Sequence, residues 1–497
     1  MIDELFNKFS AGRQPTQDDF HAGKMFLLLQ DPFGMWCSYH APKEAAVEEP
    51  NLYENLRGKT DRNTRDVWIH QHCKTTVLIS ASNDEDRFKK TLSAMAEGVD
   101  GIIGGALWDL RGNPGLMGTV NLLFKVNEGQ SIFGAYHYKI VQLKRAGEMK
   151  EHYAMQTAVM NEILSNIQQY APQNALFIFK SKEQTLDCAR IIERAKAHIS
   201  DWQLIKSGEL IPDAKKPPKA AMPPWRVFAN KYLFEKKDLA LLPHLSGQMR
   251  DALKAHNLHT YEDVANAGLP AVKNILQEPL ATDAIAIDTY WHAVAFTHGK
   301  PVLRESGIFP LTPKKRNLYF DFEATETFTK DSISFIYLIG VWDKEENKFV
   351  SFVAKNEAEE EIIFKQFADY IGPAGQSALY HWTEYEVKKM RALCDKYPAI
   401  KNDLQKLVDA CVDLKIVVER AFYLPSPSLS LKAAAPAFGF NWRQTDCGAM
   451  DSMVYFTTWL KTGDEALLKK VLMYNEDDCI AMLYVEDYLK KAEVFIP

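Results

Sequence analysis

A proline-rich, basic segment at residues 211–226, IPDAKKPPKAAMPPWR, constrains this chain more than any other feature. Its five prolines and four basic residues exclude a continuous helix or a central strand, because proline has no amide hydrogen and its φ is fixed. Such a segment forms a linker or a strap. At 497 residues the chain is also too long for one ordinary domain. We therefore expect an N-terminal domain over 1–210, a linker over 211–236 and further domains beyond it.

The composition is that of a globular chain. Apolar residues make up 46% and charged residues 25%, which excludes disordered, collagen-like and coiled-coil classes. No apolar run approaches the roughly 18 residues that span a bilayer, and we expect no secretory signal because Asp, Glu and Gln interrupt the short apolar pieces of the first 30 residues. The net charge of −6 disfavours a protein coated in basic surface. It leaves room for a nucleic-acid enzyme that surrounds an acidic metal centre with local basic patches.

The cysteines and histidines carry no metal-binding spacing. The 13 histidines show neither HExxH nor HxH, so packing or surface roles are favoured. An odd number of unclustered cysteines argues against a disulfide scaffold, a zinc site or an iron–sulfur cluster. We expect a reduced, cytoplasmic protein. The seven cysteines are Cys37, Cys73, Cys188, Cys394, Cys411, Cys447 and Cys479.

Periodicity predicts an α/β multidomain protein. In the N-terminal domain, β-branched and aromatic alternation predicts strands, and one stretch at 151–170 has helical spacing. The expected strands there are 75–80, 131–144 and 174–180. The C-terminal domain, 313–497, is expected to be a mixed sheet flanked by helices. Its expected strands are 317–324, 335–342, 348–354 and 378–382, and its expected helices are 357–371, 384–396 and a last one ending near Lys491.

Two helical regions can be described more closely. In the helix at 357–371, Ile362, Ile363, Phe367 and Ile371 are expected on one apolar face. Residues 237–312 are expected to form a helical connector. A helix–hairpin–helix module, which grips phosphate through helix N-termini, is the alternative, with Gly247 as its hairpin glycine.

Acidic residues recur at spacings that place them on common faces. Asp321 and Glu323 are two apart on a predicted strand and therefore point to the same side. Tyr474 and Asp478 are four apart on the predicted last helix and share a face. The alternatives are solvated acids on an edge strand and an acidic helix start favoured by the helix dipole.

A third acidic residue, Glu386, lies in HWTEYEVKKM, at the predicted start of a helix. Its structural alternative is a capping box with Thr383, in which the two side chains satisfy amides of the first turn. Considered singly, the capping box is the better explanation.

Together these three stretches resemble the DEDD superfamily of 3′–5′ exonucleases, which have an RNase H-like fold. The resemblance is to the tyrosine-bearing branch, and most closely to the YprB-type RNase H-like exonuclease domain. It runs from about Leu318 to Leu489 and includes YLIGV (337–341), VDL (412–414) and SLKAAAPAFGFNW (430–442).

The resemblance implies a set of functional residues. Tyr474 would orient the attacking water, and Asp477 would replace Asp478 as a ligand if the helix register differed by one. This chain has Glu386 where the superfamily usually has Asp. The implied metal ligands are Asp321, Glu323, Glu386 and Asp478.

The chemistry of phosphodiester hydrolysis explains the acids. Charge builds on the attacking and leaving oxygens, and two divalent ions about 4 Å apart stabilise both. Mg²⁺ or Mn²⁺ prefers carboxylate oxygen. The resemblance implies a metal-dependent 3′–5′ exonuclease acting on single-stranded DNA or exposed 3′ ends, with RNA not excluded and DNA repair as the expected setting. The competing hypothesis is a non-catalytic nucleic-acid-binding adaptor built from two decayed nuclease folds.

The N-terminal half resembles the RecB-type PD-(D/E)XK nuclease core. The motifs are GLMGTVNLLFKV, GAYHYKIVQLKRA and HYAMQ. The family's two metal-binding acids correspond to Asn121 and Gln142, and its Lys and Gln correspond to Lys144 and Gln156. Amides supply no negative charge for a divalent ion. We expect a catalytically inactive fold that helps to hold nucleic acid, with accidental similarity as the alternative. The order of the domains is similar to a family of bacterial RecB-like nucleases.

A few further side chains are candidates near the acids. Lys432 is expected either to contact substrate phosphate or to begin a solvated helix. Tyr385 and Trp382 are candidates for stacking on an unpaired terminal base, whereas Phe322 is expected in the core.

Overall fold

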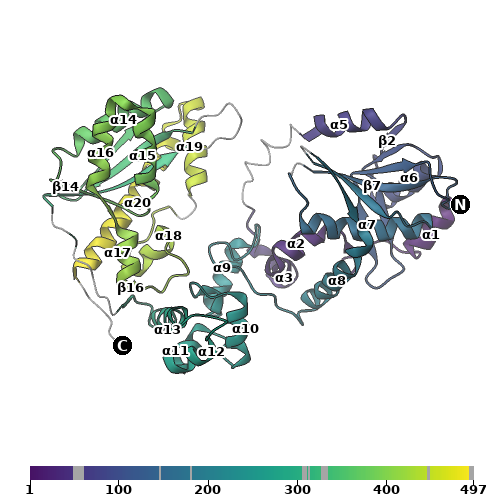
Figure 1. Cartoon of the computed structure of the whole chain (residues 1–497), viewed down its shortest axis with the longest axis horizontal. Coiled ribbons are helices and arrows are strands. Elements are labelled where there is room, and N and C mark those ends of the chain that lie inside the picture. The colour runs from purple at the N-terminus through teal and green to yellow at the C-terminus, as the bar shows by residue number, and fades with distance from the viewer. Residues whose placement is uncertain are drawn as a thin grey trace. The chain divides into compact units, whose positions relative to one another are not determined.

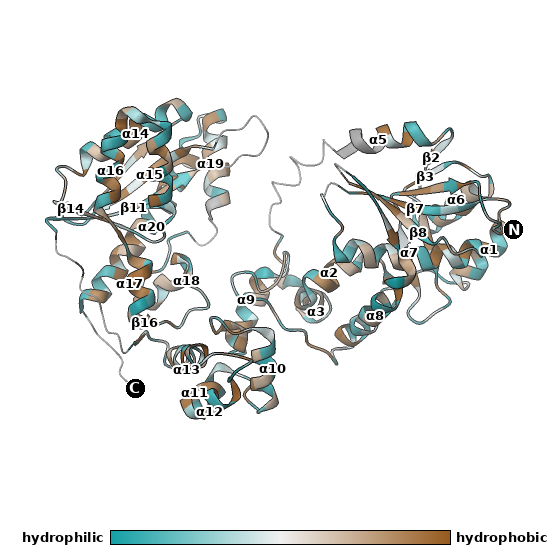
Figure 2. Cartoon of the chain, in the orientation of Figure 1, coloured by the Kyte–Doolittle hydropathy of each residue, from teal (hydrophilic) through white to brown (hydrophobic). Residues whose placement is uncertain are grey.

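The computed structural model of the chain describes residues 1–48, 61–144, 147–179, 182–304, 311, 314–325, 334–444 and 448–491 (Figure 1). The chain divides into two compact units, Met1–Leu233 and Phe234–Pro497. Both contain mixed sheets packed with helices, so the predicted α/β class is confirmed. Figure 2 shows brown, hydrophobic colour concentrated on strands and on one side of many helices, as expected where elements bury a common core.

The N-terminal unit is built on a six-stranded mixed sheet in the order β2-β3-β6-β7-β8-β9. Helix α7 (Glu151–Gln168) connects the parallel strands β7 and β8, and most of its side chains are buried. The strands are β2 (Thr76–Leu78), β3 (Gly101–Ile103), β6 (Leu122–Val126), β7 (His137–Leu143), β8 (Asn174–Ile178) and β9 (Glu183–Asp187).

The predicted strand at 131–144 begins later than expected, at His137. Ser131 and Gly134 form an isolated bridge, and Gly134 has a φ of 140°, so the chain turns there before it enters the sheet.

A smaller sheet, β1-β5-β4, covers the other side of the N-terminal core. Its strands are β1 (Phe20–His21), β4 (Ala106–Asp109) and β5 (Leu116–Thr119). Trp108 of β4 is buried against Phe6 of α1 (Ile2–Ser10) and Phe88 of α6 (Asp84–Ala96). Helices α2 (Lys24–Gln30), α3 (Pro32–His40), α5 (Asp61–His72) and α8 (Ile192–Ser207) also belong to this unit.

The proline-rich segment lies against the N-terminal unit. The Met222 amide donates to the Asp31 carboxylate, and the Val47 amide donates to the Pro224 carbonyl. The expected linker at 211–236 is only partly correct, because helix α9 (Arg226–Glu235) occupies its second half. Pro224 is the last proline of the run, so the residues after it have the amides that a helix needs.

A helical region opens the second unit. It consists of α10 (Gly247–Ala255), α11 (Tyr261–Ala267), α12 (Leu269–Ile275) and α13 (Asp283–His298). The tight turn between α11 and α12 is at Gly268, with a φ of 82°, whereas Gly247 begins α10. Gly247, the glycine expected for a hairpin, thus lies in the first turn of a helix, and the positive φ between two of these helices is at Gly268.

The C-terminal sheet has five strands in the order β13-β12-β11-β14-β15. The pairs β11–β12 and β12–β13 are antiparallel, and β11–β14 and β14–β15 are parallel. The strands are β11 (Arg316–Ala324), β12 (Ile336–Asp343), β13 (Lys348–Val353), β14 (Ser377–His381) and β15 (Cys411–Asp413). A short pair, β10 (Val302–Leu303) with β16 (Phe422–Tyr423), joins the helical region to this domain.

Helices cover both faces of this sheet. Helices α14 (Glu360–Tyr370) and α16 (Lys401–Ala410) share one core with Leu318, Phe320 and Phe322 of β11. Helices α17 (Leu414–Ala421) and α20 (Glu465–Lys491) share the other core with Tyr319. Alternate residues of β11 therefore point to opposite layers, as a strand requires.

One predicted core residue is wrong. Ile362 on α14 is 53% exposed, whereas Ile363, Phe364 and Phe367 are buried. Positions 363, 364 and 367 follow the i, i+1, i+4 pattern of one helical face, and Ile362 lies one position outside it.

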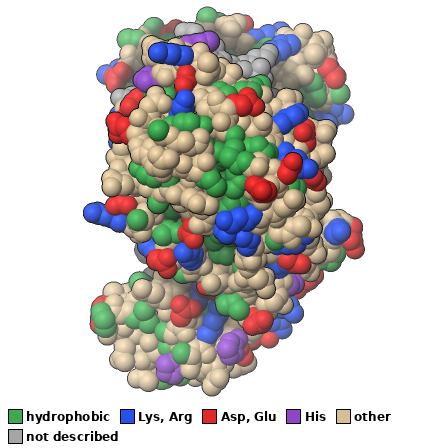
Figure 3. All heavy atoms as spheres, turned by 90° about the vertical axis from the view of Figure 1, so that its right-hand side faces the viewer, with side chains coloured by type: hydrophobic (Ala, Val, Ile, Leu, Met, Phe, Trp, Pro, Cys, Tyr) green, Lys and Arg blue, Asp and Glu red, His purple; other side chains and the backbone are tan. Residues whose placement is uncertain are grey.

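The face of the molecule that Figure 3 shows carries side chains of both charges. Acidic and basic side chains are interspersed there, and hydrophobic side chains gather toward the middle. Among the described helices, none is both long and apolar enough to cross a bilayer. Six of the cysteines are free thiols, and Cys447 lies outside the described residues.

A buried ion pair yields a prediction for the N-terminal unit. The two terminal nitrogens of the Arg13 guanidinium, Nη1 and Nη2, donate to Asp19 at 2.6 and 2.7 Å. The Thr16 and Gly115 backbone amides donate to the same carboxylate. The Arg13 hydrogen bonds are the main cause that lowers the pKa of Asp19 to about 2. We expect Asp19→Asn to lower the free energy of unfolding by about 1–3 kcal/mol at pH 7.

The same pair should show a defined pH dependence. Because the folded pKa of Asp19 lies below its unfolded value of about 3.9, the stabilisation is present above pH 4 and is lost as the pH falls toward 2. Urea unfolding between pH 2 and 7 checks this, with the exposed neighbour Asp18→Asn as control. A constant difference between wild type and Asp19→Asn across that range would contradict it.

Candidate metal centre and active site

Strand β11 carries two acids on the face that α20 covers. Leu318, Phe320 and Phe322 fill the opposite core, so Asp321 and Glu323 necessarily point the other way. This is the common face that the spacing of two predicts, although β11 lies in the middle of the sheet and is not an edge strand.

Helix α20 brings Asp478 to the same place. One carboxylate oxygen from each of Asp321, Glu323 and Asp478 lies within 4.8 Å of the others. Glu323 and Asp478 are buried and Asp321 is half-buried. Tyr474, one turn before Asp478 on α20, is also buried, and its burial and the negative charge of Asp478 raise the pKa of its hydroxyl. We call Asp321, Glu323 and Asp478 the acid trio.

Each carboxylate of the acid trio accepts a hydrogen bond from a neutral donor. The Asn475 amide donates to Asp321 at 2.9 Å, and the Trp442 indole donates to Asp478 at 2.8 Å. The Tyr337 hydroxyl lies 3.3 Å from Glu323. Neutral donors orient a carboxylate without cancelling its charge, which leaves the charge available to a cation.

The trio is electrostatically strained without a cation. Burial is the main cause that raises the pKa of Glu323 to about 8 and of Asp478 to about 6, and it raises the pKa of Asp321 well above its ordinary value. The negative charge of Asp478 further raises the pKa of Glu323 and of Asp321. The Trp442 hydrogen bond and the positive charge of Lys432 act in the opposite direction on Asp478.

Close contact between α20 and the sheet positions Asn475. Gly340 of β12 pairs with Asp321 across the antiparallel ladder, and a Cβ at position 340 would overlap the Asn475 Oδ1. Asn475 is fully buried. Only glycine therefore lets the Asn475 side chain lie against β12 while it donates to Asp321.

Asn475, Trp442 and Tyr337 were not predicted as site residues. The available signal was the glycine inside the strand pattern YLIGV, which indicates close approach of another group. Nothing in the sequence indicated what would approach.

Asp477 does not join the acid trio. Its carboxylate accepts from the Arg443 backbone amide at 2.8 Å and from the Arg443 Nε at 2.6 Å. Asp477 is thus occupied by an ion pair on another face of α20, and the helix register presents Asp478 to the other acids.

Glu386 also lies outside the trio. It is buried at the start of α15 (Tyr385–Lys396), where its Oε2 is 3.5 Å from the Thr383 hydroxyl and 3.6 Å from His381 Nδ1. Burial and the charges of Asp478 and Glu323 are the larger causes of the raised pKa of Asp321, and the negative charge of Glu386 adds to them. The capping box is not formed as expected, because the N-cap residue of α15 is Glu384.

Lys432 borders the acids. It lies on α18 (Leu431–Ala434), and its Nζ is 4.6 Å from the centre of the Tyr474 ring. Its positive charge lowers the pKa of Glu323 and Asp478. Lys432 is therefore placed where a phosphate near the acid trio would meet it.

A cavity of about 370 Å³ opens beside Glu323. Tyr385 on its wall is 39% exposed, whereas Trp382 is buried and donates to the Leu429 carbonyl. Phe322 is buried in the core shared with Phe364, as expected. The other lining residues are Ala324, Thr325, Ser334, Lys389, Met450 and Met453.

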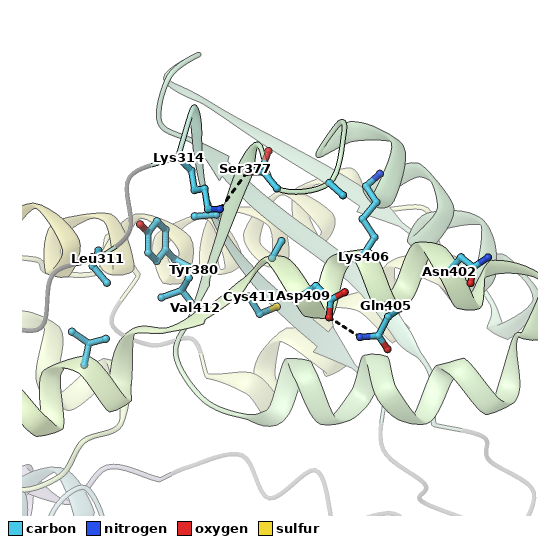
Figure 4. Close-up of a pocket in the computed structure, with 15 residues that line it drawn as sticks. Leu311, Lys314, Ser377, Tyr380, Asn402, Gln405, Lys406, Asp409, Cys411 and Val412 are labelled. Carbon is cyan, nitrogen blue, oxygen red and sulfur yellow. Dashed lines mark hydrogen bonds between the residues drawn. The ribbon is translucent and has the colours of Figure 1, made fainter.

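A second cavity of about 680 Å³ lies near the beginning of β14, whereas the acids lie toward the end of the parallel strand β11. Figure 4 shows Ser377, Tyr380 and Cys411 from the strands, with α16 contributing Gln405 and Lys406. The Lys406 amine donates to the Ala368 carbonyl. This cavity contains no member of the acid trio.

In the N-terminal unit, Asn121 and Gln142 lie at neighbouring register positions. Leu122 pairs with Val141, so the residue before β6 and Gln142 of β7 are next along the ladder. Lys144 follows β7, its amine is 4.6 Å from the Tyr153 ring, and burial lowers its pKa. Gln156 lies on α7. Over the residues that the structure describes, acid groups suited to a metal converge only at the acid trio.

The acid trio fits a divalent cation. Three carboxyl groups offer oxygen ligands that can carry negative charge, which match the preference of Mg²⁺ and Mn²⁺, and a bound cation would favour the ionised forms and relieve the repulsion among them. In contrast, the amides at Asn121 and Gln142 supply no such charge.

Comparison with known proteins assigns the C-terminal domain. Residues 318–490 match the family model for the RNase H superfamily. The expectation of an RNase H-like domain in this part of the chain is thereby confirmed. No curated protein matches the chain.

Two solved structures show limited likeness. A family B DNA polymerase from the hyperthermophilic archaeon Pyrobaculum calidifontis is 17% identical, over 47% of this chain and 34% of the polymerase, with a TM-score of 0.28. The protein SSO0001 is 10% identical, over 40% of this chain and 83% of that protein, with a TM-score of 0.20. The chain thus spans about a third of the length of the polymerase.

The contact between Gly340 and Asn475 yields a prediction. Gly340→Ala should lower the free energy of unfolding by about 1–3 kcal/mol, because the added methyl group must displace Asn475. Gly247→Ala is the control, since open space surrounds that position. Thermal and urea unfolding measure the effect.

A double-mutant cycle with Asn475→Ala separates the overlap from general strain. Gly340→Ala should cost much less in the Asn475→Ala background, where the overlapping oxygen is gone. Additive losses would show that Asn475 is not the group displaced.

Proposed function

We propose that this protein is a metal-dependent 3′–5′ exonuclease of the DEDD type whose active site is the acid trio. The observation that carries the proposal is the convergence of Asp321, Glu323 and Asp478 within 4.8 Å, inside the part of the chain that matches the RNase H superfamily. Buried acids of raised pKa have no structural advantage unless a cation uses them.

The residues divide into groups of distinct role. Asp321, Glu323 and Asp478 would hold Mg²⁺ or Mn²⁺, and Glu386 would join them as a further ligand through its longer side chain. When bound, two such ions lower the pKa of water and stabilise charge on phosphate oxygens. Tyr474 would orient the attacking water through its hydroxyl beside Asp478, and Lys432 would hold the phosphate.

The substrate we propose is single-stranded DNA or an exposed 3′ end. The cavity beside Glu323 supports this, because Tyr385 offers a partly exposed ring on which an unpaired base can stack. RNA can make the same stacking contacts, so the assay below includes it.

For residues 1–210 we propose a degenerate RecB-like nuclease fold that assists nucleic-acid binding. Asn121 and Gln142 at adjacent register positions, followed by Lys144, support this assignment. The C-terminal domain, 313–497, would then be of the YprB type, and the whole protein would act in the cytoplasm in DNA repair.

A non-catalytic nucleic-acid-binding protein is the competing function. It is favoured by the position of Glu386 outside the acid trio. Activity in the presence of metal separates the two.

We predict that Asp321→Ala and Asp478→Asn each reduce cleavage about 10³-fold or more, because several kcal/mol of charge stabilisation is lost. The assay is Mn²⁺-dependent shortening of 5′-labelled single-stranded DNA, duplex DNA and RNA. Asp487→Asn on the same helix, where Asp487 pairs with Lys344, is the control. Equal cleavage by wild type and both variants would overturn the proposal, as would its absence in all.

We predict that Lys144→Ala leaves cleavage almost unchanged and weakens single-strand binding by a few-fold, as expected for loss of one phosphate contact. Filter binding in EDTA measures affinity apart from cleavage, and Lys139→Ala on the same strand is the control. A loss of cleavage as large as that of Asp321→Ala would show that the N-terminal site is catalytic.

A further inference from the structure

The segment after the 3₁₀ turn η6 (Ala435–Phe438) forms hydrogen bonds with two consecutive acids of α20, Asp477 and Asp478. The Trp442 indole Nε1–H donates to Asp478 Oδ1 at 2.8 Å. The next residue, Arg443, binds Asp477 through its backbone amide and its guanidinium group. The two residues thus fix which acid of α20 faces β11 and which faces away.

The aromatic ring of Trp442 is itself held in place. It packs edge-to-face on Phe440, with ring centres 5.0 Å apart, and Phe440 packs on Tyr484 of α20 at 5.3 Å. A ring supported on the same helix that carries Asp478 keeps the indole N–H aimed at the carboxylate. The donor is therefore preorganised and does not depend on a flexible side chain.

The chemistry of the donor suits a ligand for a cation. An indole N–H carries no charge, so it fixes one oxygen of Asp478 and leaves the second oxygen and the full negative charge to the centre. A lysine or arginine at this position would orient the carboxylate but would also compete with the cation. The chain instead directs its arginine to Asp477, outside the acid trio.

We propose that Trp442 is a positioning residue for the metal centre, which sets the orientation of Asp478 and thereby the affinity of the trio for Mg²⁺ or Mn²⁺. This inference rests on the proposed function. It assigns to the segment 440–443 a role beyond packing, since loss of a single N–H should change metal binding.

The test compares two substitutions of the same kind. Trp442→Phe keeps an aromatic ring against Phe440 but removes the donor. Trp459→Phe is the matched control, because the Trp459 indole donates to Glu465 at 3.2 Å, a carboxylate outside the acid trio. Metal affinity is measured from the rise in Tm of the full chain as MnCl₂ is added, a readout that needs no catalysis.

Trp442→Phe should weaken Mn²⁺ binding about 10- to 100-fold, as expected when the hydrogen-bond partner of a metal ligand is lost. The kcat should fall at fixed low Mn²⁺ and recover at high Mn²⁺, with the KM for the oligonucleotide unchanged. Trp459→Phe should bind Mn²⁺ as the wild type does.

A second comparison separates a specific effect on Asp478 from a general loss of fold stability. In the Asp478→Asn background, Trp442→Phe should cause no further loss of Mn²⁺ affinity, because the carboxylate that it positions is already gone. Wild-type affinity in Trp442→Phe, equal losses in both tryptophan variants, or an undiminished loss in the Asp478→Asn background would each overturn the inference alone. A wild-type chain with neither an Mn²⁺-dependent Tm shift nor cleavage would remove the proposed function as well.

Discussion

The close approach of α20 to strands β11 and β12 is the constraint on which the candidate site depends. Gly340 leaves room for the Asn475 side chain, which fills the space a Cβ would occupy and donates to Asp321. From this contact the helix presents Asp478 to Asp321 and Glu323. A side chain at position 340 would overlap the Asn475 side chain, which would have to move away from the position from which it donates to Asp321.

The same contact places like charges together, which ordinarily destabilises a fold. The surrounding structure tolerates these acids because each carboxylate of the trio accepts a hydrogen bond. The nearby arginine and lysine side chains pair with acids that flank the trio. Arg443 pairs with Asp477 and Glu476, and Lys344 pairs with Glu486 and Asp487. Arg443 and Lys344 thus neutralise acids that flank the acid trio, whereas the trio itself accepts hydrogen bonds from neutral donors and would be ionised by a bound cation.

The mixed sheets of the two units carry different polar side chains. In the N-terminal unit, Asn121 and Gln142 place amides at neighbouring register positions, and Lys144 is half-buried with its amine 4.6 Å from the Tyr153 ring. In the C-terminal unit the acids are present and converge. Over the described residues, the acids that could hold a divalent cation are therefore gathered in the C-terminal unit alone.

The sequence by itself determined the elements and the faces of the acids. Alternation on β11 put Asp321 and Glu323 on one side, and a spacing of four put Tyr474 and Asp478 on one side of α20, because these periods are properties of the local backbone. Tertiary structure alone decided that these faces meet, that Asp477 pairs with Arg443, that Glu386 lies outside the trio and that Trp442 contacts Asp478. Contacts between residues far apart in the chain are set by the packing of whole elements, and local spacing carries no information about that packing.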